Sequence, residues 1–240
     1  MSDMKLDLTL SANAGVSLQF RSAKIWIDAL HDEGLPGYST LNAERIRQME
    51  QTEAFSDPDV IIFTHTHEDH FSRRLAAKAM KDWPEAKVFI PEDVLPGAVL
   101  LDRDIEEITA GDVRITFVRM THMGDHYAHV PHYAVMMQED GFTVLFAADT
   151  ALGSRELQAF CADKHTDAAL LPFPWVTLRL GRSFVEEQIR PEHVFLLHLP
   201  FEGEDTEGYR EATAKCYTKL KGCSDVRVLG EFLQHETIDR

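Results

Sequence analysis

The sequence is poor in cysteine, in long apolar runs and in basic residues, and each shortage excludes a class of protein. Its three cysteines, Cys161, Cys216 and Cys223, are odd in number and form no close metal-ligand pair, so we expect reduced structural thiols. No uninterrupted apolar stretch approaches the roughly 20 residues of a membrane span. The first residues, MSDMK, lack the hydrophobic core of a signal peptide. We therefore expect a cytoplasmic protein with no membrane partner.

Basic residues are outnumbered, because 24 Lys and Arg stand against 40 Asp and Glu and give a formal charge of -16. Such a surface repels a polyanion, so nucleic acid is not an expected partner. A small anion could still bind where a metal ion reverses the local sign of the field. The 240 residues are 44% hydrophobic and show no repeat or linker. We expect a single domain over residues 1–240, with a substantial core.

The densest chemistry lies in residues 64–70, THTHEDH, directly after the apolar run Val60–Phe63. This run is short, rich in β-branched residues and preceded by Asp57-Pro58, which predicts a buried strand. Five of the next seven positions are His, Glu or Asp, and imidazoles with carboxylates suit zinc and its first-row neighbours. Ser72 can then cap a helix. The cluster is thus predicted at the carboxyl end of a strand, where sheet proteins commonly build sites.

Other strands are expected where alternating, β-branched or aromatic residues are bounded by turn signals. They cover residues 5–10, 15–20, 24–28, 87–90, 112–120, 133–138, 142–147, 168–171, 194–197 and 226–229, the last as an edge strand. Helical patterns cover residues 41–52, 73–83 and 206–220, and residues 91–101 are expected to be a helical or looped connection. Strands in both halves, each half followed by helices, indicate an α/β fold.

The spacing in the motif predicts two metal ions. His65 and His67 lie two positions apart, so an extended backbone points both to one side. Asp69 and His70 follow the turn and suit a second ion, because so short a loop cannot wrap all four side chains around one cation. Further ligands must come from other strand ends, and the candidates there are His122, Asp149 and His198. A carboxylate such as Asp149 can bridge two cations and leave a position for water, which is the pattern of hydrolytic sites.

The chain also resembles a known family. THTHEDH matches the T-H-x-H-x-D-H signature of the metallo-β-lactamase superfamily, and residues 146–150, FAADT, look like its strand-end motif with the bridging Asp149. His198, after a buried strand, is similar to the last ligand of the family. The resemblance covers nearly the whole chain. It implies a four-layer αββα sandwich, in which two mixed sheets are flanked by helices, and two divalent metal ions, usually zinc and sometimes manganese or iron.

The resemblance also implies which residues hold each ion. His65, His67 and a third histidine would bind the first ion. Asp69, His70 and His198 would bind the second, and Asp149 would bridge the two. The loop 121–132 offers four candidates for the third histidine, namely His122, His126, His129 and His132. We prefer His122, because it ends a strand and has the spacing seen in the branch resembling ascorbate-6-phosphate lactonase, while the other three stay open.

This ligand set predicts a metal-dependent hydrolase that attacks a small ester, lactone or phosphodiester with a metal-bound hydroxide. Asp69 would be the catalytic residue that orients the nucleophile. The substrate-binding residues are unknown, although Arg179 and Arg182 could bind an anionic substrate if they are not surface ion-pair partners. The alternatives are a non-catalytic metal- or ligand-binding protein on the same fold and a diiron redox protein. An oligomer is compatible with the sequence.

Three residues near the motif receive lesser roles. Asp28 ends a predicted strand and is interpreted as a turn or capping residue, with a place behind the metal ligands as the alternative. His31 is interpreted as a loop histidine, and Glu68 as a solvated carboxylate.

Overall fold

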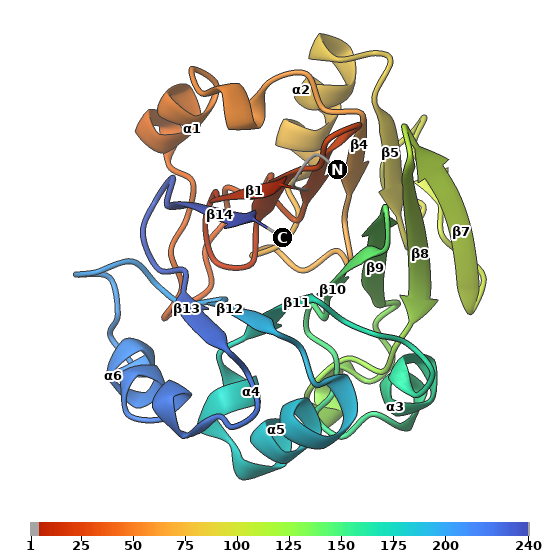
Figure 1. Cartoon of the computed structure of the whole chain (residues 1–240). Coiled ribbons are helices and arrows are strands. Elements are labelled where there is room, and N and C mark those ends of the chain that lie inside the picture. Colours follow the sequence, from red (N-terminus) through yellow and green to blue (C-terminus); the bar gives the residue numbers. More distant parts are fainter. Residues whose placement is uncertain (1–4, 240) are drawn as a thin grey trace.

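The computed structural model describes residues 5–239 and places two seven-stranded sheets face to face (Figure 1). Residues 1–4 lie outside the described residues, and they include most of the stretch from which we predicted that there is no signal peptide. The first sheet has the order β14 (His235–Asp239), β1 (Lys5–Leu10), β2 (Val16–Gln19), β3 (Lys24–Ile27), β4 (Val60–Ile62), β5 (Lys87–Ile90) and β6 (Val99–Leu100). The second has the order β13 (Asp225–Val228), β12 (His193–Leu197), β11 (Ala168–Pro172), β10 (Phe142–Phe146), β9 (Tyr133–Glu139), β8 (Val113–Arg119) and β7 (Ile105–Ala110).

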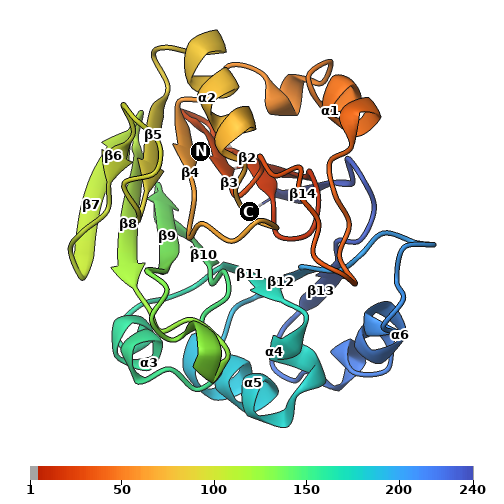
Figure 2. The ribbon, with the colours of Figure 1, turned by 180° about the vertical axis from the view of Figure 1, so that it is seen from behind.

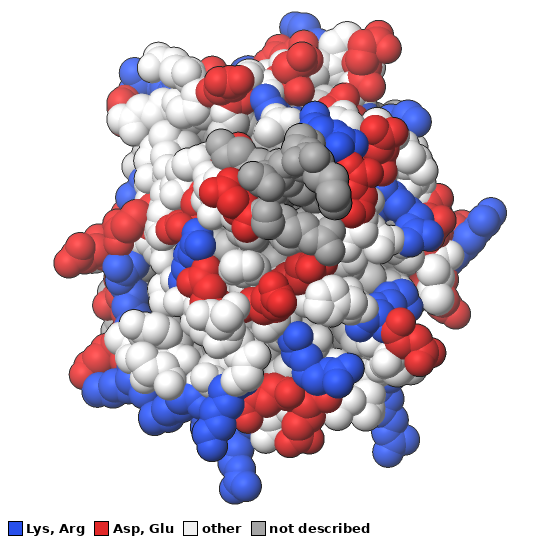
Figure 3. Space-filling view, in the orientation of Figure 1, with Lys and Arg blue, Asp and Glu red and all other residues white. Residues whose placement is uncertain are grey.

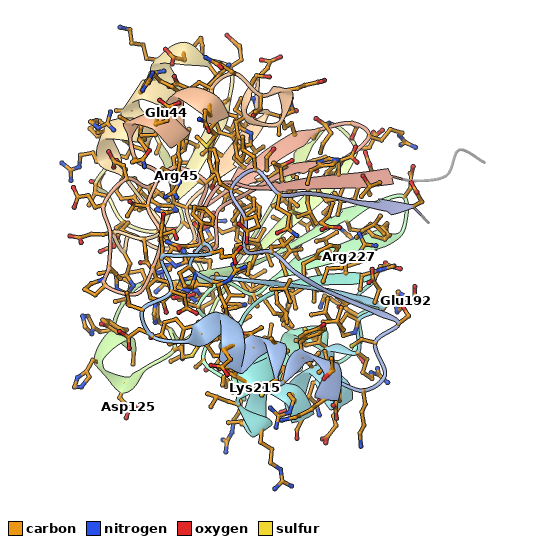
Figure 4. The ribbon with its side chains drawn as sticks, turned by 90° about the vertical axis from the view of Figure 1, so that its left-hand side faces the viewer. Glu44, Arg45, Asp125, Glu192, Lys215 and Arg227 are labelled. Atoms are coloured by element: carbon orange, nitrogen blue, oxygen red, sulfur yellow. The ribbon has the colours of Figure 1, made fainter. Side chains whose placement is uncertain are left out.

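Both sheets are mixed, and their parallel halves position the site. In the first sheet β1, β2 and β3 form the expected antiparallel hairpins, and β3, β4 and β5 then run parallel. In the second sheet β10, β11 and β12 run parallel. In Figure 4, Glu192, just before β12, and Asp125 are labelled at opposite edges of the molecule. The carboxyl end of β12 therefore points toward the Asp125 edge.

Helices cover the outer face of each sheet. The first sheet carries α1 (Ala43–Met49), η1 (Glu53–Phe55) and α2 (Arg73–Asp82). On the side of the second sheet lie α3 (Arg155–Cys161), α4 (Pro174–Thr177), α5 (Arg179–Phe184), η3 (Val185–Ile189), α6 (Tyr209–Ala214) and η4 (Tyr217–Lys219). Figures 1 and 2 show these two groups of helices on opposite sides of the paired sheets. The αββα sandwich expected from the resemblance is confirmed.

The main core lies between the two sheets. Phe89 of the first sheet and Phe117 of the second are both buried, and their ring centroids lie 5.1 Å apart. A second core forms between the second sheet and its helices, where Trp175 is fully buried. Burial of one large apolar side chain stabilises a fold by roughly 1.5–3 kcal/mol, so these two cores hold the four layers together.

All of the strands predicted from the sequence are present, but the prediction was incomplete. It missed β14, which pairs with β1, so residues 226–229 supply an edge strand but not the last strand. It also missed β6, β7 and helices α3, α4 and α5. The sequence of β7, IEEITA, alternates exposed and half-buried positions at a sheet edge and gives no strong apolar signal.

The helix predicted over residues 206–220 was too long. Gly208, at a φ of 76°, delays its start to Tyr209, and the chain turns at Cys216 into the short helix η4. Among the described residues, none of the helices has both the length and the apolar character that a membrane crossing requires. On the face in Figure 3, acidic and basic side chains are interspersed.

Candidate metal centre

The proposed ligands converge where the strands of both sheets end. The motif 64–70 follows β4, and Asp28 follows the neighbouring parallel strand β3. Asp149 and His198 follow β10 and β12 of the facing sheet. His122 follows β8 of that sheet, and its backbone forms an isolated antiparallel β-bridge with Thr150. Parallel strands end at one sheet edge, so residues up to 133 positions apart, His65 and His198, reach a common centre.

The backbone is strained at three of these strand ends. Asp28, Ala148 and His198 adopt positive φ angles of 49°, 45° and 65°. Residues with a Cβ rarely adopt this left-handed conformation, which costs of the order of 1 kcal/mol or more and concentrates at functional sites. The strain turns the chain sharply at the end of each strand, next to the cluster of candidate ligands.

The first group of candidate ligands consists of His65, His67 and His122, one nitrogen of each lying within 4.8 Å of the others. His122 donates through Nδ1 to the carbonyl of Met123 at 2.7 Å. Its Nε2 therefore carries a lone pair, and it lies 3.4 Å from Nε2 of His65.

His65 presents a lone pair as well. The Thr64 hydroxyl donates to Asp28 Oδ2 at 2.6 Å and so accepts from Nδ1 of His65 at 3.0 Å. This leaves Nε2 of His65 unprotonated in the neutral ring. Two lone pairs that face each other repel, and a cation between them removes the repulsion. The donor set thus fits a metal ion.

The second group consists of Asp69, His70 and His198. Nε2 of His70 lies 3.0 Å from Nε2 of His198 and 3.8 Å from Oδ2 of Asp69. Oδ2 of Asp69 lies 3.3 Å from Nε2 of His198. These side chains are buried, and two imidazoles with one carboxylate are ordinary ligands for a divalent transition metal.

Asp149 lies between the two groups. Its Oδ2 is 3.5 Å from Nε2 of His70 and 3.7 Å from Nε2 of His122, and its Oδ1 is 3.7 Å from Nε2 of His198. Oδ1 is also buried without a hydrogen bond among residues 5–239. A buried carboxylate oxygen that lacks a donor is costly unless a cation satisfies it. Asp149 therefore has carboxylate oxygens near histidines of both groups.

Burial and neighbouring charges together shift the pKa values of the cluster, and not all in the same direction. Burial lowers the pKa of His65 well below its usual value, and the neighbouring His70 adds to this effect. Burial also opposes protonation of His70, yet Asp149, Asp69 and Asp28 together raise its pKa. Burial would raise the pKa values of Asp69 and Asp149, but nearby imidazoles hold both below the usual range. Both carboxylates therefore stay ionised and can bind a cation.

Asp28 has the role that the sequence analysis ranked second. Its carboxylate accepts hydrogen bonds from the Thr64 amide at 2.8 Å, the Thr64 hydroxyl at 2.6 Å and Nδ1 of His70 at 2.8 Å. Asp28 does lie at a bend of the chain, as one interpretation had it, but its carboxylate caps no helix. Because both its oxygens are engaged, Asp28 orients His70 and, through Thr64, also His65. Asp28 reaches Thr64 because the strands before these two residues, β3 and β4, are neighbours in the sheet. The sequence alone did not show that β3 and β4 pair.

The other loop histidines belong to neither group of candidate ligands. His126 and His129 are exposed in the loop around η2 (Asp125–Tyr127). His132 is fully buried behind the site, 5.3 Å in ring centroids from His65 and from His122, and neither of its nitrogens has a hydrogen-bond partner among the described residues. Burial lowers the pKa of His132 to about 3. His31 is in a loop as expected but is buried, with Nε2 3.2 Å from the Ala12 carbonyl.

A pocket of about 580 Å³ opens onto the cluster. The ring of Tyr38 stands edge-on to His198, with centroids 4.6 Å apart, and the ring of Tyr127 lies 4.9 Å from that of His67. Neither tyrosine was predicted from the sequence, because neither belongs to a motif and only the folded loops bring them to the site. Glu68, exposed as expected, lies in the wall.

The two arginines considered for substrate binding do not line this pocket. Arg179 is exposed at the start of α5, and Arg182 donates to the carbonyls of Val176 and Thr177. Arg182 therefore stabilises the end of α4, and the surface ion pair considered for it is absent from the described residues.

No protein-family model matches the sequence, and a search of curated proteins gave no match. Solved structures do match. Igni18, a metallo hydrolase from Ignicoccus hospitalis, is similar with a TM-score of 0.68 and 21% identity over 98% of each chain. The metallo-β-lactamase fold protein YhfI from Bacillus subtilis is similar with a TM-score of 0.65 and 14% identity over 99% of this chain and all of that one.

A third similar structure is CmlA, a diiron β-hydroxylase from Streptomyces venezuelae, with a TM-score of 0.61 and 15% identity. The match covers 98% of this chain but only 54% of CmlA, so this chain corresponds to about half of that protein. These likenesses, together with the two helix-flanked mixed sheets, show that the chain has the metallo-β-lactamase fold.

Proposed function

We propose that the protein is a metal-dependent hydrolase with a dinuclear site. The observation that carries the proposal is the pair of facing imidazole nitrogens in each group, with the under-bonded Asp149 between them. In this proposal His65, His67 and His122 would hold the first ion. Asp69, His70 and His198 would hold the second, and Asp149 would be a ligand shared by both.

When bound, the two ions would supply Lewis acidity and lower the pKa of a coordinated water. Zinc is the preferred metal in this proposal, with manganese or iron as the alternatives. The protein's own contribution is orientation. Asp28 and Met123 fix the ring orientations of His70 and His122. Asp69 is buried and ionised, so it can accept a hydrogen bond from the attacking water and orient it.

The proposed substrate is a small molecule with an ester, lactone or phosphodiester bond. The pocket has the size of an ordinary small-molecule site and leads directly to the cluster. A single domain and a cytoplasmic setting remain predictions from the sequence. The branch resembling ascorbate-6-phosphate lactonase also remains a prediction, which depends on the spacing of His122.

The likeness to CmlA supports a second candidate function, a diiron oxidation centre. Imidazoles and carboxylates with open positions also suit iron. The two candidates differ in their metal and in their need for a reductant and dioxygen. A protein that keeps its metal and has neither activity would be the non-catalytic binding protein.

The decisive experiment measures metal content and hydrolysis together. Protein purified without chelator is assayed for zinc, manganese and iron and for hydrolysis of a generic lactone and a bis-aryl phosphodiester. We expect about two ions per chain for the parent, about one fewer for His122→Ala, and no loss for the exposed His129→Ala in the same loop. His132→Ala tests the buried neighbour and is expected to keep both ions.

Three results would contradict the proposal in whole or in part. Fewer than one ion per chain after gentle purification contradicts the dinuclear site. Full metal content in His122→Ala with loss in His132→Ala would move the third ligand to His132. An iron chromophore with dioxygen-dependent oxidation and without hydrolysis would favour the second candidate.

A further inference from the structure

Part of the pocket wall above the candidate metal centre is apolar and aromatic. This part is formed by Leu35, Met123, Pro172 and Pro174, together with the rings of Tyr38 and Tyr127. Leu35 is 38% exposed and Tyr127 is 49% exposed, although both are large side chains at the mouth of a site. Exposed apolar surface of this kind is stabilised when a ligand with an apolar body covers it.

Apart from any bound ions, the charged side chains that line the pocket are all acidic. Among the described residues, none of those that line it is Lys or Arg, whereas Glu68, Asp69 and Asp149 are all part of its wall. Arg179 is exposed at the start of α5 and is not part of the pocket lining, and two other arginines from nearby elements are engaged elsewhere. Arg182 binds carbonyls at the end of α4, and Arg45 binds the Thr40 carbonyl and pairs with Glu204.

This charge pattern separates two classes of substrate. A phosphorylated substrate would bring a second anionic group besides the one that the ions hold, and that group would find no cationic side chain in the pocket. Placing an uncompensated charge next to carboxylates is costly, because it loses hydration and gains repulsion. A neutral molecule avoids this cost and gains contact with the apolar walls.

We infer, building on the proposed hydrolase function, that the substrate is an uncharged carboxylic ester or lactone with an apolar or aromatic body. Water adds to the carbonyl carbon, the acyl–oxygen bond breaks, and the leaving oxygen takes a proton. The products are an alcohol or phenol, a carboxylate and one released proton; from a lactone, the alcohol and carboxylate remain in one molecule.

Tyr38 is placed to bind the ester group. Its ring stands against His198, and its hydroxyl makes no hydrogen bond within residues 5–239. Tyr38 lines the pocket, so its hydroxyl can donate a hydrogen bond to an ester oxygen there. Tyr127, on the η2 loop, supplies an aromatic face beside His67.

The test compares matched substrates on the zinc-loaded protein. A neutral aryl lactone and a p-nitrophenyl ester are set against a phosphorylated sugar lactone and bis-p-nitrophenyl phosphate. We expect kcat/KM to be at least about 100-fold higher for the neutral pair, the size of discrimination that a few kcal/mol of binding provides. Tyr127→Ala should raise KM for the aryl lactone about tenfold with little change in kcat, since it removes one aromatic contact.

Two further variants sharpen the comparison. Met123→Arg adds a cation to the wall and should shift the preference toward the phosphorylated lactone. Leu180→Ala changes a side chain that is 59% exposed and outside the pocket, and its kinetics should match the parent.

The outcomes distinguish this inference from the proposed function. Faster hydrolysis of the phosphorylated lactone or the phosphodiester by the parent would overturn the inference and leave the hydrolase function standing. An unchanged KM in Tyr127→Ala would also count against it. If metal-loaded protein hydrolyses none of the four substrates, the hydrolase function fails, and the inference fails with it.

Discussion

Replacing Asp28 by Asn tests whether the metal centre depends on a residue that does not belong to the ligand motif. The carboxylate accepts three hydrogen bonds, two from Thr64 and one from Nδ1 of His70. Asn is nearly isosteric and tolerates the positive φ of 49° at this position, so the backbone should keep its course. The amide has one acceptor and one donor group, so it cannot accept all three hydrogen bonds.

The consequence falls on His70. If the amide nitrogen faces Nδ1, that nitrogen must accept, and the proton moves to Nε2, the atom that lies 3.0 Å from Nε2 of His198. A protonated Nε2 cannot bind a metal. Loss of such an orienting partner typically lowers metal affinity about 10- to 100-fold. This corresponds to roughly 1.4–2.8 kcal/mol of binding free energy.

Competition with a chromophoric chelator measures this affinity, and the second ion should be affected more than the first. Asp167→Asn is the matched control. Asp167 is also buried and also accepts hydrogen bonds from a backbone amide, that of Thr143, and from a histidine, His165. It differs from Asp28 in its place, because it precedes β11 and does not follow a strand. We expect parental affinity in the control. Equal zinc affinity of Asp28→Asn and the parent would refute the argument that Asp28 orients the site.

Two further predictions concern stability. Burial lowers the pKa of His31 to about 4, so the folded state resists protonation, and stability should fall as pH drops from 6.5 to 4. In urea unfolding without metal, His31→Gln should recover about 3 kcal/mol of unfolding free energy at the acid end of this range. The control His165→Gln, at an exposed position, should show no such recovery. Parallel curves of stability against pH for the parent and His31→Gln would contradict this prediction. Phe117→Ala should cost about 3–5 kcal/mol of unfolding free energy, because Phe117 is fully buried between the sheets. The control is Ile105→Ala on the neighbouring strand, where the side chain is 59% exposed, and its unfolding free energy should stay within about 0.5 kcal/mol of the parent. Similar losses in both variants would show that the two sheets are not held by this core.

Local sequence patterns predicted the elements that build the site. The apolar run before residue 64 predicted β4, and Ser72 predicted the start of α2, where its side chain accepts from the Leu75 amide. The alternating residues around the turn 139–141 predicted the hairpin of β9 and β10 that leads to Asp149. These features depend on neighbours in the chain, so their signal is present in the sequence.

The elements that the sequence did not predict depend on distant partners. The strand β14 becomes a strand because β1 offers it an edge, and its register with β1 joins residues more than 220 positions apart. Helices α4 and α5 are short, and their stability comes from packing of Trp175 and Phe184 against the second sheet. Local propensity is weak in such segments.

The sequence by itself determined the ligand chemistry of this protein. Three histidines and two carboxylates in seven residues already indicated a divalent metal, and the resemblance supplied the αββα fold. Only the tertiary structure decided which side chains share the centre. It placed His122 beside His65 and His67, left His126 and His129 in solvent, and made Asp28 the anchor of His70. The reason is that ligand type is a local property, whereas distance between strand ends is set by the pairing and facing of two sheets.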